Sequence, residues 1–126
     1  MSADSLLSLY EKFIADYPED TLVAGYLFKA ATLAMNIDEG AKAISFFDQY
    51  LRDFPGGPKA PLCSFFRAYV QENLLKNLDQ AKESYLQFLE KYPDHDFSDD
   101  ARAALENLGK SPEQLIREFE ARQKAN

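Results

Sequence analysis

The chain has 126 residues, of which 46% are hydrophobic and 28% charged, and its 14 lysines and arginines face 21 aspartates and glutamates. This length predicts one domain, and the composition excludes a disordered or collagen-like chain. The net charge of −7 argues against nucleic acid and anionic membranes as partners, because both require a basic face.

Apolar residues recur at helical spacing along the whole chain, and no strand-like alternation persists. We therefore predict an all-α fold. The expected helices, in chain order, cover 4–17, 21–35, 38–54, 60–75, 78–92, 97–108 and 112–124.

The second expected helix lies in the most apolar stretch of the chain, 21–37. This stretch is short for a membrane span and carries Lys29 near its centre, so we expect a buried helix and no direct membrane span. The start at Met1 shows no basic stretch followed by an apolar run, so it does not have the pattern of a secretory signal.

Local signals mark several of the later helix ends. Asn77 with Gln80 and Ser111 with Gln114 have the spacing of capping boxes, and Gly109 stands where a helix would end in a left-handed turn. Cys63 is the only cysteine, so the chain forms no intramolecular disulfide. We expect Cys63 to lie in the core, on an apolar helix face.

A six-residue motif occurs three times and reads aromatic, aliphatic, variable, charged, aromatic, proline. Its copies are 13–18, 50–55 and 88–93, so the prolines stand 37 and 38 residues apart. The two aromatic residues of each copy share a helix face, and the proline ends the helix. Antiparallel helix pairs repeated at this period predict an α-solenoid. We expect the rings of Phe13, Tyr50 and Phe88 to hold the stack together.

The segment from 77 to 93 resembles the second helix of a tetratricopeptide repeat. The residues that match the family's small, aromatic and proline positions are Ala81, Tyr85 and Pro93, and in the preceding copy Ala43, Phe47, Tyr50 and Pro55. Phe88 departs from the pattern, because the general family prefers alanine there. This aromatic variant most resembles the bacterial envelope branch: the C-terminal domain of the Tol–Pal coordinating protein and the outer-membrane assembly lipoprotein.

The repeats predict one domain over 1–126, with about three repeats over 5–110 and a C-terminal capping helix over 111–124. The expected helix at 4–17 ends in the motif that is typical of the second helix of a repeat. The first helix of that repeat, which would precede it, would therefore be missing. Either the natural protein is longer or the helix at 4–17 covers its open face by association. The last helix carries Leu115, Ile116 and Phe119 on one face. We expect that face to cap the stack, and the alternative is that it occupies the groove of another copy.

No motif in the sequence supports catalysis. There is no glycine-rich phosphate loop, no paired-cysteine metal motif and no HExxH, so we expect no enzymatic activity, no cofactor and no metal. Acidic residues over 94–100 alternate like calcium-loop ligands, but Asp99 stands where glycine is needed and Leu105 where glutamate belongs. His95, the only histidine, has no evident nucleophile beside it.

The resemblance implies a protein-interaction scaffold that holds a peptide or helix of a partner on its concave face. In such solenoids the first helix of each pair lines that face, here 21–35, 60–75 and 97–108. The polar residues there that packing does not require are the predicted contact residues: Lys29, Thr32, Asn36, Arg67, Gln71, Asn73, Arg102 and Asn107. The alternative is that they form a solvated helix face. The alternative function is self-association, as a homo-oligomer, through a terminal helix. The envelope resemblance implies the bacterial periplasm if a signal was removed, and the cytoplasm is expected otherwise.

Overall fold

The computed structural model describes residues 1–125, and these form seven α-helices and no strand. The all-α fold that the periodicity predicted is confirmed. The helices are α1 (Ala3–Asp16), α2 (Val23–Asn36), α3 (Gly40–Asp53), α4 (Ala60–Asn73), α5 (Leu78–Lys91), α6 (Ser98–Asn107) and α7 (Pro112–Ala125). Their ends differ from the predicted ends by two residues or fewer at most positions.

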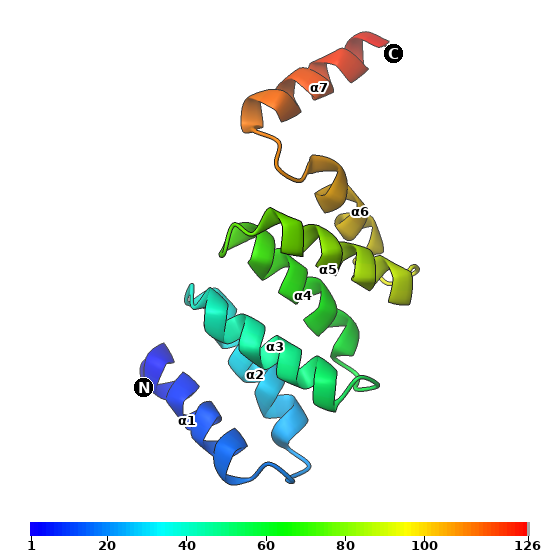
Figure 1. The fold of residues 1–126 in the computed structure, drawn as a ribbon. Coiled ribbons are helices and arrows are strands. Elements are labelled where there is room, and N and C mark those ends of the chain that lie inside the picture. Colours follow the sequence, from blue (N-terminus) through cyan, green and yellow to red (C-terminus); the bar gives the residue numbers. More distant parts are fainter. Residues whose placement is uncertain (126) are drawn as a thin grey trace.

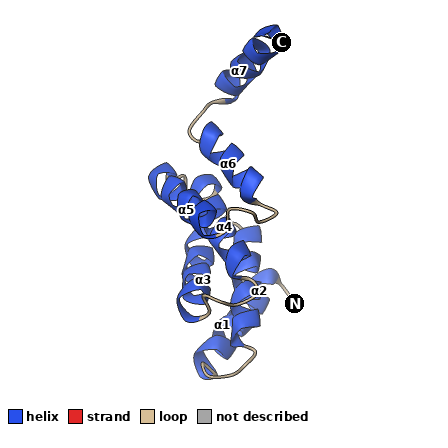
Figure 2. Ribbon diagram, turned by 90° about the vertical axis from the view of Figure 1, so that its right-hand side faces the viewer, coloured by secondary structure: helices blue, strands red, loops and turns tan. Residues whose placement is uncertain are grey.

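From α1 to α6, each helix packs against the next one along the chain. The result is an elongated stack of antiparallel helices, which is the architecture of a TPR-like α-solenoid (Figure 1). In the side view, α3 and α5 lie on one side of this stack and α2 and α4 on the other (Figure 2). The first helices of the pairs therefore form one layer and the second helices form the opposite layer.

The three helices that precede a motif proline end in the same way. Tyr17, Phe54 and Tyr92 follow the last helical residue and have φ near −130°. Each of their backbone N–H groups donates to the carbonyl of the first aromatic residue of the motif, at 2.7–2.9 Å. The proline excludes helical backbone at the residue before it, so each helix stops at this point.

The core forms two clusters of buried side chains, one spanning α1 to α4 and one spanning α4 to α6. Tyr50 lies in the first cluster and Phe88 in the second, both fully buried, as predicted. Phe13 is half-buried and packs edge-on against Tyr26 of α2, with ring centroids 4.7 Å apart. The buried motif rings thus link neighbouring helix pairs.

The last helix, α7, extends from the end of the stack (Figure 1) and buries none of its residues. More than half of the surface of Ile116 and of Phe119 is exposed, at 57% and 59%. The packed face that we expected of a capping helix is therefore not formed within the chain, and the capping role stays a prediction. The physical reason lies in the turn between α6 and α7, where Gly109 has φ +78° and the chain does not reverse.

Among the described residues, no helix has both the length and the hydropathy that a membrane span requires.

Candidate functional site

A groove opens on the layer of first helices, with a volume of about 450 Å³. We call it the aromatic groove. It is lined by Met35 and Asn36 at the end of α2, Phe65, Phe66 and Tyr69 of α4, Leu74 after α4 and Phe97 before α6. The helices α2 and α4 and the N-cap residue of α6 thus contribute to it. Tyr69 is 42% exposed.

Ring contacts fix the floor of the aromatic groove. Phe65 stacks on Phe97 with ring centroids 4.9 Å apart, and it meets the buried ring of Phe88 edge-on at 5.5 Å. Phe66 packs against Phe47 of α3, with centroids 6.1 Å apart. Because these partners belong to the core, the groove is held in shape before any ligand binds.

One residue with an exposed carboxamide lines the aromatic groove. Asn36 is exposed at the last position of α2 and lines the groove. Asn73, also exposed, ends α4 and donates a hydrogen bond from its side chain to the carbonyl of Tyr69 at 3.1 Å. Since the backbone of an extended peptide needs hydrogen-bond partners, a carboxamide at this rim suits such a ligand.

The predicted contact residues of α2 lie around a second, shallower hollow. Lys29, Thr32 and Asn36 line a space of about 260 Å³ between α1 and α2, so Asn36 borders both depressions. The Lys29 ammonium lies 5.5 Å from the centre of the Tyr26 ring. The Thr32 hydroxyl bonds to carbonyls of its own helix, at 3.0 and 3.2 Å. The structure thus brings these three residues together, as the helical spacing predicted.

Arg67 and Gln71 lie on the opposite side of α4, between α3 and α5. The Arg67 guanidinium donates to Asp48 Oδ1 and to Gln87 Oε1, both at 3.1 Å. Gln71 is buried and accepts from the Ser84 hydroxyl through Oε1 at 2.5 Å. The assumption that packing does not require these two residues is wrong, because they join the second helices to α4. They are outside the aromatic groove.

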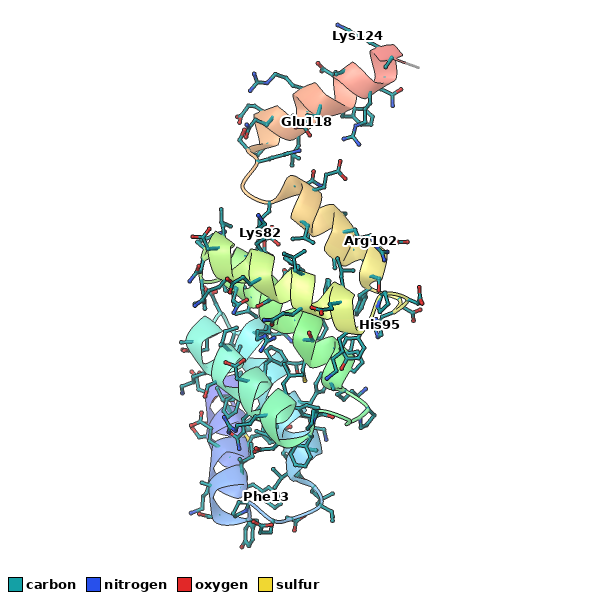
Figure 3. All side chains as sticks on the ribbon, turned by 45° about the vertical axis from the view of Figure 1, so that its right-hand side comes forward. Phe13, Lys82, His95, Arg102, Glu118 and Lys124 are labelled. Atoms are coloured by element: carbon teal, nitrogen blue, oxygen red, sulfur yellow. The ribbon has the colours of Figure 1, made fainter. Side chains whose placement is uncertain are left out.

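The two predicted residues of α6 are also separate from the groove. Arg102 is exposed near the start of α6, beside the turn that carries His95 (Figure 3). Its guanidinium donates to Asp99 at 2.9 Å and to the Pro93 carbonyl at 3.0 Å, so it braces that turn. Asn107 is half-buried at the last position of α6.

The aromatic lining residues are the ones that sequence reasoning missed. Phe65, Phe66 and Tyr69 follow the helical periodicity around Cys63, so the sequence pattern alone does not distinguish them from core residues. One signal in the sequence could have distinguished these groove residues from the core residues of the same helix. The apolar residues of 62–70 cover more of the helix circumference than one packed stripe needs. An apolar surplus on a first helix indicates a side exposed to a ligand.

The chain's single cysteine and single histidine both have structural surroundings. Burial raises the pKa of the Cys63 thiol to about 12, against the lowering effect of Arg67 and Lys59, so the thiol stays protonated at neutral pH. The Nδ1 atom of His95 accepts the Phe97 backbone N–H at 3.0 Å, which assigns this histidine to the turn. Within residues 1–125, no group of three or more histidine, cysteine, aspartate or glutamate side chains could hold a metal ion.

Burial also acts on the tyrosine that matches the repeat motif in α5. Tyr85 is buried, and its hydroxyl donates to Glu72 Oε1 of α4 at 2.7 Å. Burial first, and then the hydrogen bond and negative charge of Glu72, raise the pKa of Tyr85 above its ordinary value. Tyr85 is therefore a neutral donor that ties α5 to α4.

Comparison with known families identifies one segment. Residues 67–95 match the tetratricopeptide repeat family, and no curated protein matches the chain. The matched segment runs from α4 through α5 into the turn after the motif proline. Repeats of this family generally act as non-catalytic modules for protein interaction. Residues 67–95 are therefore similar to a tetratricopeptide repeat, and the chain around them folds as a TPR-like α-solenoid.

Proposed function

We propose that this chain is a non-catalytic scaffold that binds a peptide segment of another protein in the aromatic groove. The observation that carries the proposal is the exposure of Tyr69. This side chain is 42% exposed and lines the groove together with the aromatic rings of its floor. A partly exposed aromatic side chain over a rigid apolar surface is typical of a binding hot spot.

The lining of the groove indicates what kind of peptide would bind. The rings of Phe66 and Phe97 offer an apolar surface to one large aliphatic or aromatic side chain. The carboxamide of Asn36 at the rim would bond to the peptide backbone. The net charge of −7 favours a segment with basic residues beside its apolar anchor.

The test is selection from a displayed library of random peptides, followed by affinity measurement with synthetic copies of the enriched sequences. We expect peptides with a large apolar anchor, and we expect Tyr69→Ala to weaken their binding by about tenfold or more, as loss of a hot spot does. Tyr17→Ala is the matched control, because Tyr17 is also exposed but lies at the other end of the stack. Equal binding by wild type and Tyr69→Ala would refute the groove as the site.

We also propose a place in the bacterial cell envelope, on the ground that the motif carries the aromatic variant Phe88 at a position where the general family has alanine. The measurement is fractionation of the source cells with an antibody against this chain. Recovery with the periplasmic contents supports the proposal, and recovery only with the cytosol would contradict it.

A further inference from the structure

A second surface, independent of the aromatic groove, lies at the α5–α6 end of the stack. On α5, Leu78, Lys82 and Leu86 are spaced four residues apart and therefore share one helix face. A methyl group added at Gly109 would meet the side chain of Leu78 at 3.5 Å, which places this face beside the end of α6. Leu78 and Leu86 are 40% and 49% exposed. We call Leu78, Leu86 and the half-buried Leu105 and Leu108 of α6 the leucine face.

The repeat shows what this face is built to contact. One repeat earlier, Asp48 of α3 accepts from Arg67 of α4, which in turn reaches the next second helix at Gln87. At 38 residues further on, Leu86 stands in place of Asp48 and Leu105 in place of Arg67. At these two positions the contact that α3 and α4 make with the following second helix is polar, whereas the equivalent positions of α5 and α6 carry leucines. These leucines call for a following helix with an apolar face.

The chain carries a helix of that kind in α7. Its N-cap resembles that of α5: Ser111 Oγ accepts the backbone N–H of Gln114 at 3.1 Å, as Asn77 Oδ1 accepts that of Gln80 at 3.2 Å. The connecting segments also read alike: 73–77 is Asn-Leu-Leu-Lys-Asn and 107–111 is Asn-Leu-Gly-Lys-Ser. They stand 34 rather than 38 residues apart because α6 has 10 residues and α4 has 14. By sequence, α7 is the second helix of a third pair.

The structure keeps α7 away from its own α6. In the α4–α5 turn, the residue with positive φ is Lys76, directly before the N-cap, and the chain reverses. In the α6–α7 turn it is Gly109, one position earlier. The Lys110 ammonium binds Glu118 Oε2 of α7 at 2.8 Å, so this connecting segment pairs with α7. An α7 from a second copy can reach the leucine face without changing this turn.

Charge and apolar pattern agree between the two surfaces. On α7, Glu118 and Glu120 flank the stripe formed by Ile116 and Phe119. On α5, Lys82 stands in the middle of the leucine face, and within residues 1–125 it forms no ion pair. Figure 3 shows Lys82 on α5 and Glu118 on α7. An acid-flanked apolar stripe thus fits an apolar face with a cation at its centre.

We propose that two copies of this chain exchange their C-terminal helices, so that α7 of each copy packs on the leucine face of the other. The arrangement is closed by a twofold axis, since each copy donates one helix and receives one. It completes the third helix pair of both copies and covers the exposed ring of Phe119 in each.

Light scattering of the full chain, coupled to size-exclusion chromatography, tests the proposal. We expect a mass about twice the monomer's 14.3 kDa. Leu86→Glu disrupts the leucine face that receives the helix, and Phe119→Glu disrupts the apolar stripe of α7 that packs on it. Each variant alone should therefore elute as a monomer, with the wild-type circular dichroism spectrum. An equimolar mixture of the two should regain dimers, because it retains one intact contact. A monomeric wild type, or dimers that persist in both variants, would overturn the proposal.

Two control variants test whether the dimer depends on this contact alone. Leu9→Glu alters a leucine of α1 that is exposed to the same extent as Leu86, 49%, and should leave the dimer intact. Tyr69→Ala should also leave it intact, so that failure of the peptide groove and failure of the helix exchange are distinguishable.

Cysteine cross-linking distinguishes exchange between copies from packing within one chain. In the double variant Leu86→Cys/Phe119→Cys, oxidation should link two chains covalently. A disulfide within one chain would show that α7 folds back on its own α6 and would refute the exchange.

Discussion

Replacement of Phe88 by alanine is expected to lower the free energy of unfolding by about 3–5 kcal/mol, as measured by urea denaturation. Phe88 is fully buried and lies at the centre of the α4–α6 cluster. Its ring meets Phe65 at 5.5 Å and both Tyr92 and His95 at 5.7 Å, measured between centroids. Truncation removes these contacts and leaves a cavity that the rigid helices on either side fill only in part.

Tyr17→Ala is the matched control for Phe88→Ala. Tyr17 belongs to the same repeated motif, but its ring is 57% exposed, so its loss should cost less than about 1 kcal/mol. Equal destabilisation by the two variants would refute the role of the buried motif ring in joining the helix pairs.

Leu27→Ala is expected to cost about 2–5 kcal/mol. Leu27 is fully buried in α2 and belongs to the α1–α4 cluster, so it tests the half of the core that Phe88 does not reach. Because a solenoid is stabilised mainly by contacts between neighbouring units, the loss of stability should be concentrated in the helices around Leu27. Hydrogen exchange should accelerate most in α1, α2 and α3.

The control for this substitution is Leu9→Ala, which shortens an exposed leucine on α1. It should change the free energy of unfolding by no more than about 0.5 kcal/mol. If Leu27→Ala raised exchange equally in α5 and α6, the chain would unfold as one cooperative unit and the division into two clusters would have no energetic meaning.

Features set by neighbouring residues could be predicted from the sequence. The motif prolines stop three helices because the effect acts on the adjacent residue. The caps at Asn77 and Ser111 depend only on residues three positions away, and in both the side chain accepts the expected backbone N–H. The reciprocal bond of a capping box forms only at Ser111, because the Asn77 N–H donates to the Gln71 carbonyl instead. The burial of Tyr50 and Phe88 follows from the helical spacing of the motif. These features account for the close agreement of the helix boundaries.

The side of a helix that meets a ligand could not be predicted in the same way. One side of α4 contacts α3 and α5. The opposite side of α4 lines the aromatic groove. Arg67 resembles a free cation in the sequence, and only the angle between successive pairs brings it to Asp48 and Gln87. The position of Tyr69 on the exposed side depends on that same angle, which no local pattern encodes.

The course of α7 differs from the expectation for a similar reason. Leu115, Ile116 and Phe119 share a face, as the spacing predicts, but whether that face packs depends on the backbone of the preceding turn. The two turns differ in where the positive φ stands: at Lys76, directly before the N-cap of α5, and at Gly109, two positions before the start of the capping box at Ser111. The first helices also differ in length, with 14 residues in α4 and 10 in α6.

The assignment of Arg67 and Gln71 to packing sharpens the distinction between the two layers. On the side of the second helices, polar contacts join α4 to α3 and α5, whereas the layer of first helices leaves aromatic surface open. Substitutions in the two layers should therefore affect different properties of the protein. Changes at Arg67 should act on stability, and changes at Tyr69 should act on binding.

The most direct test of the peptide-binding groove is to map a library-selected peptide on the chain by nuclear magnetic resonance. We expect the largest chemical-shift changes at Asn36, Phe66 and Tyr69, with little change at Arg67 and Gln71 on the opposite side of α4. Shifts concentrated around Arg67, Asp48 and Gln87, with Tyr69 unaffected, would contradict the groove and place the partner on the layer of second helices.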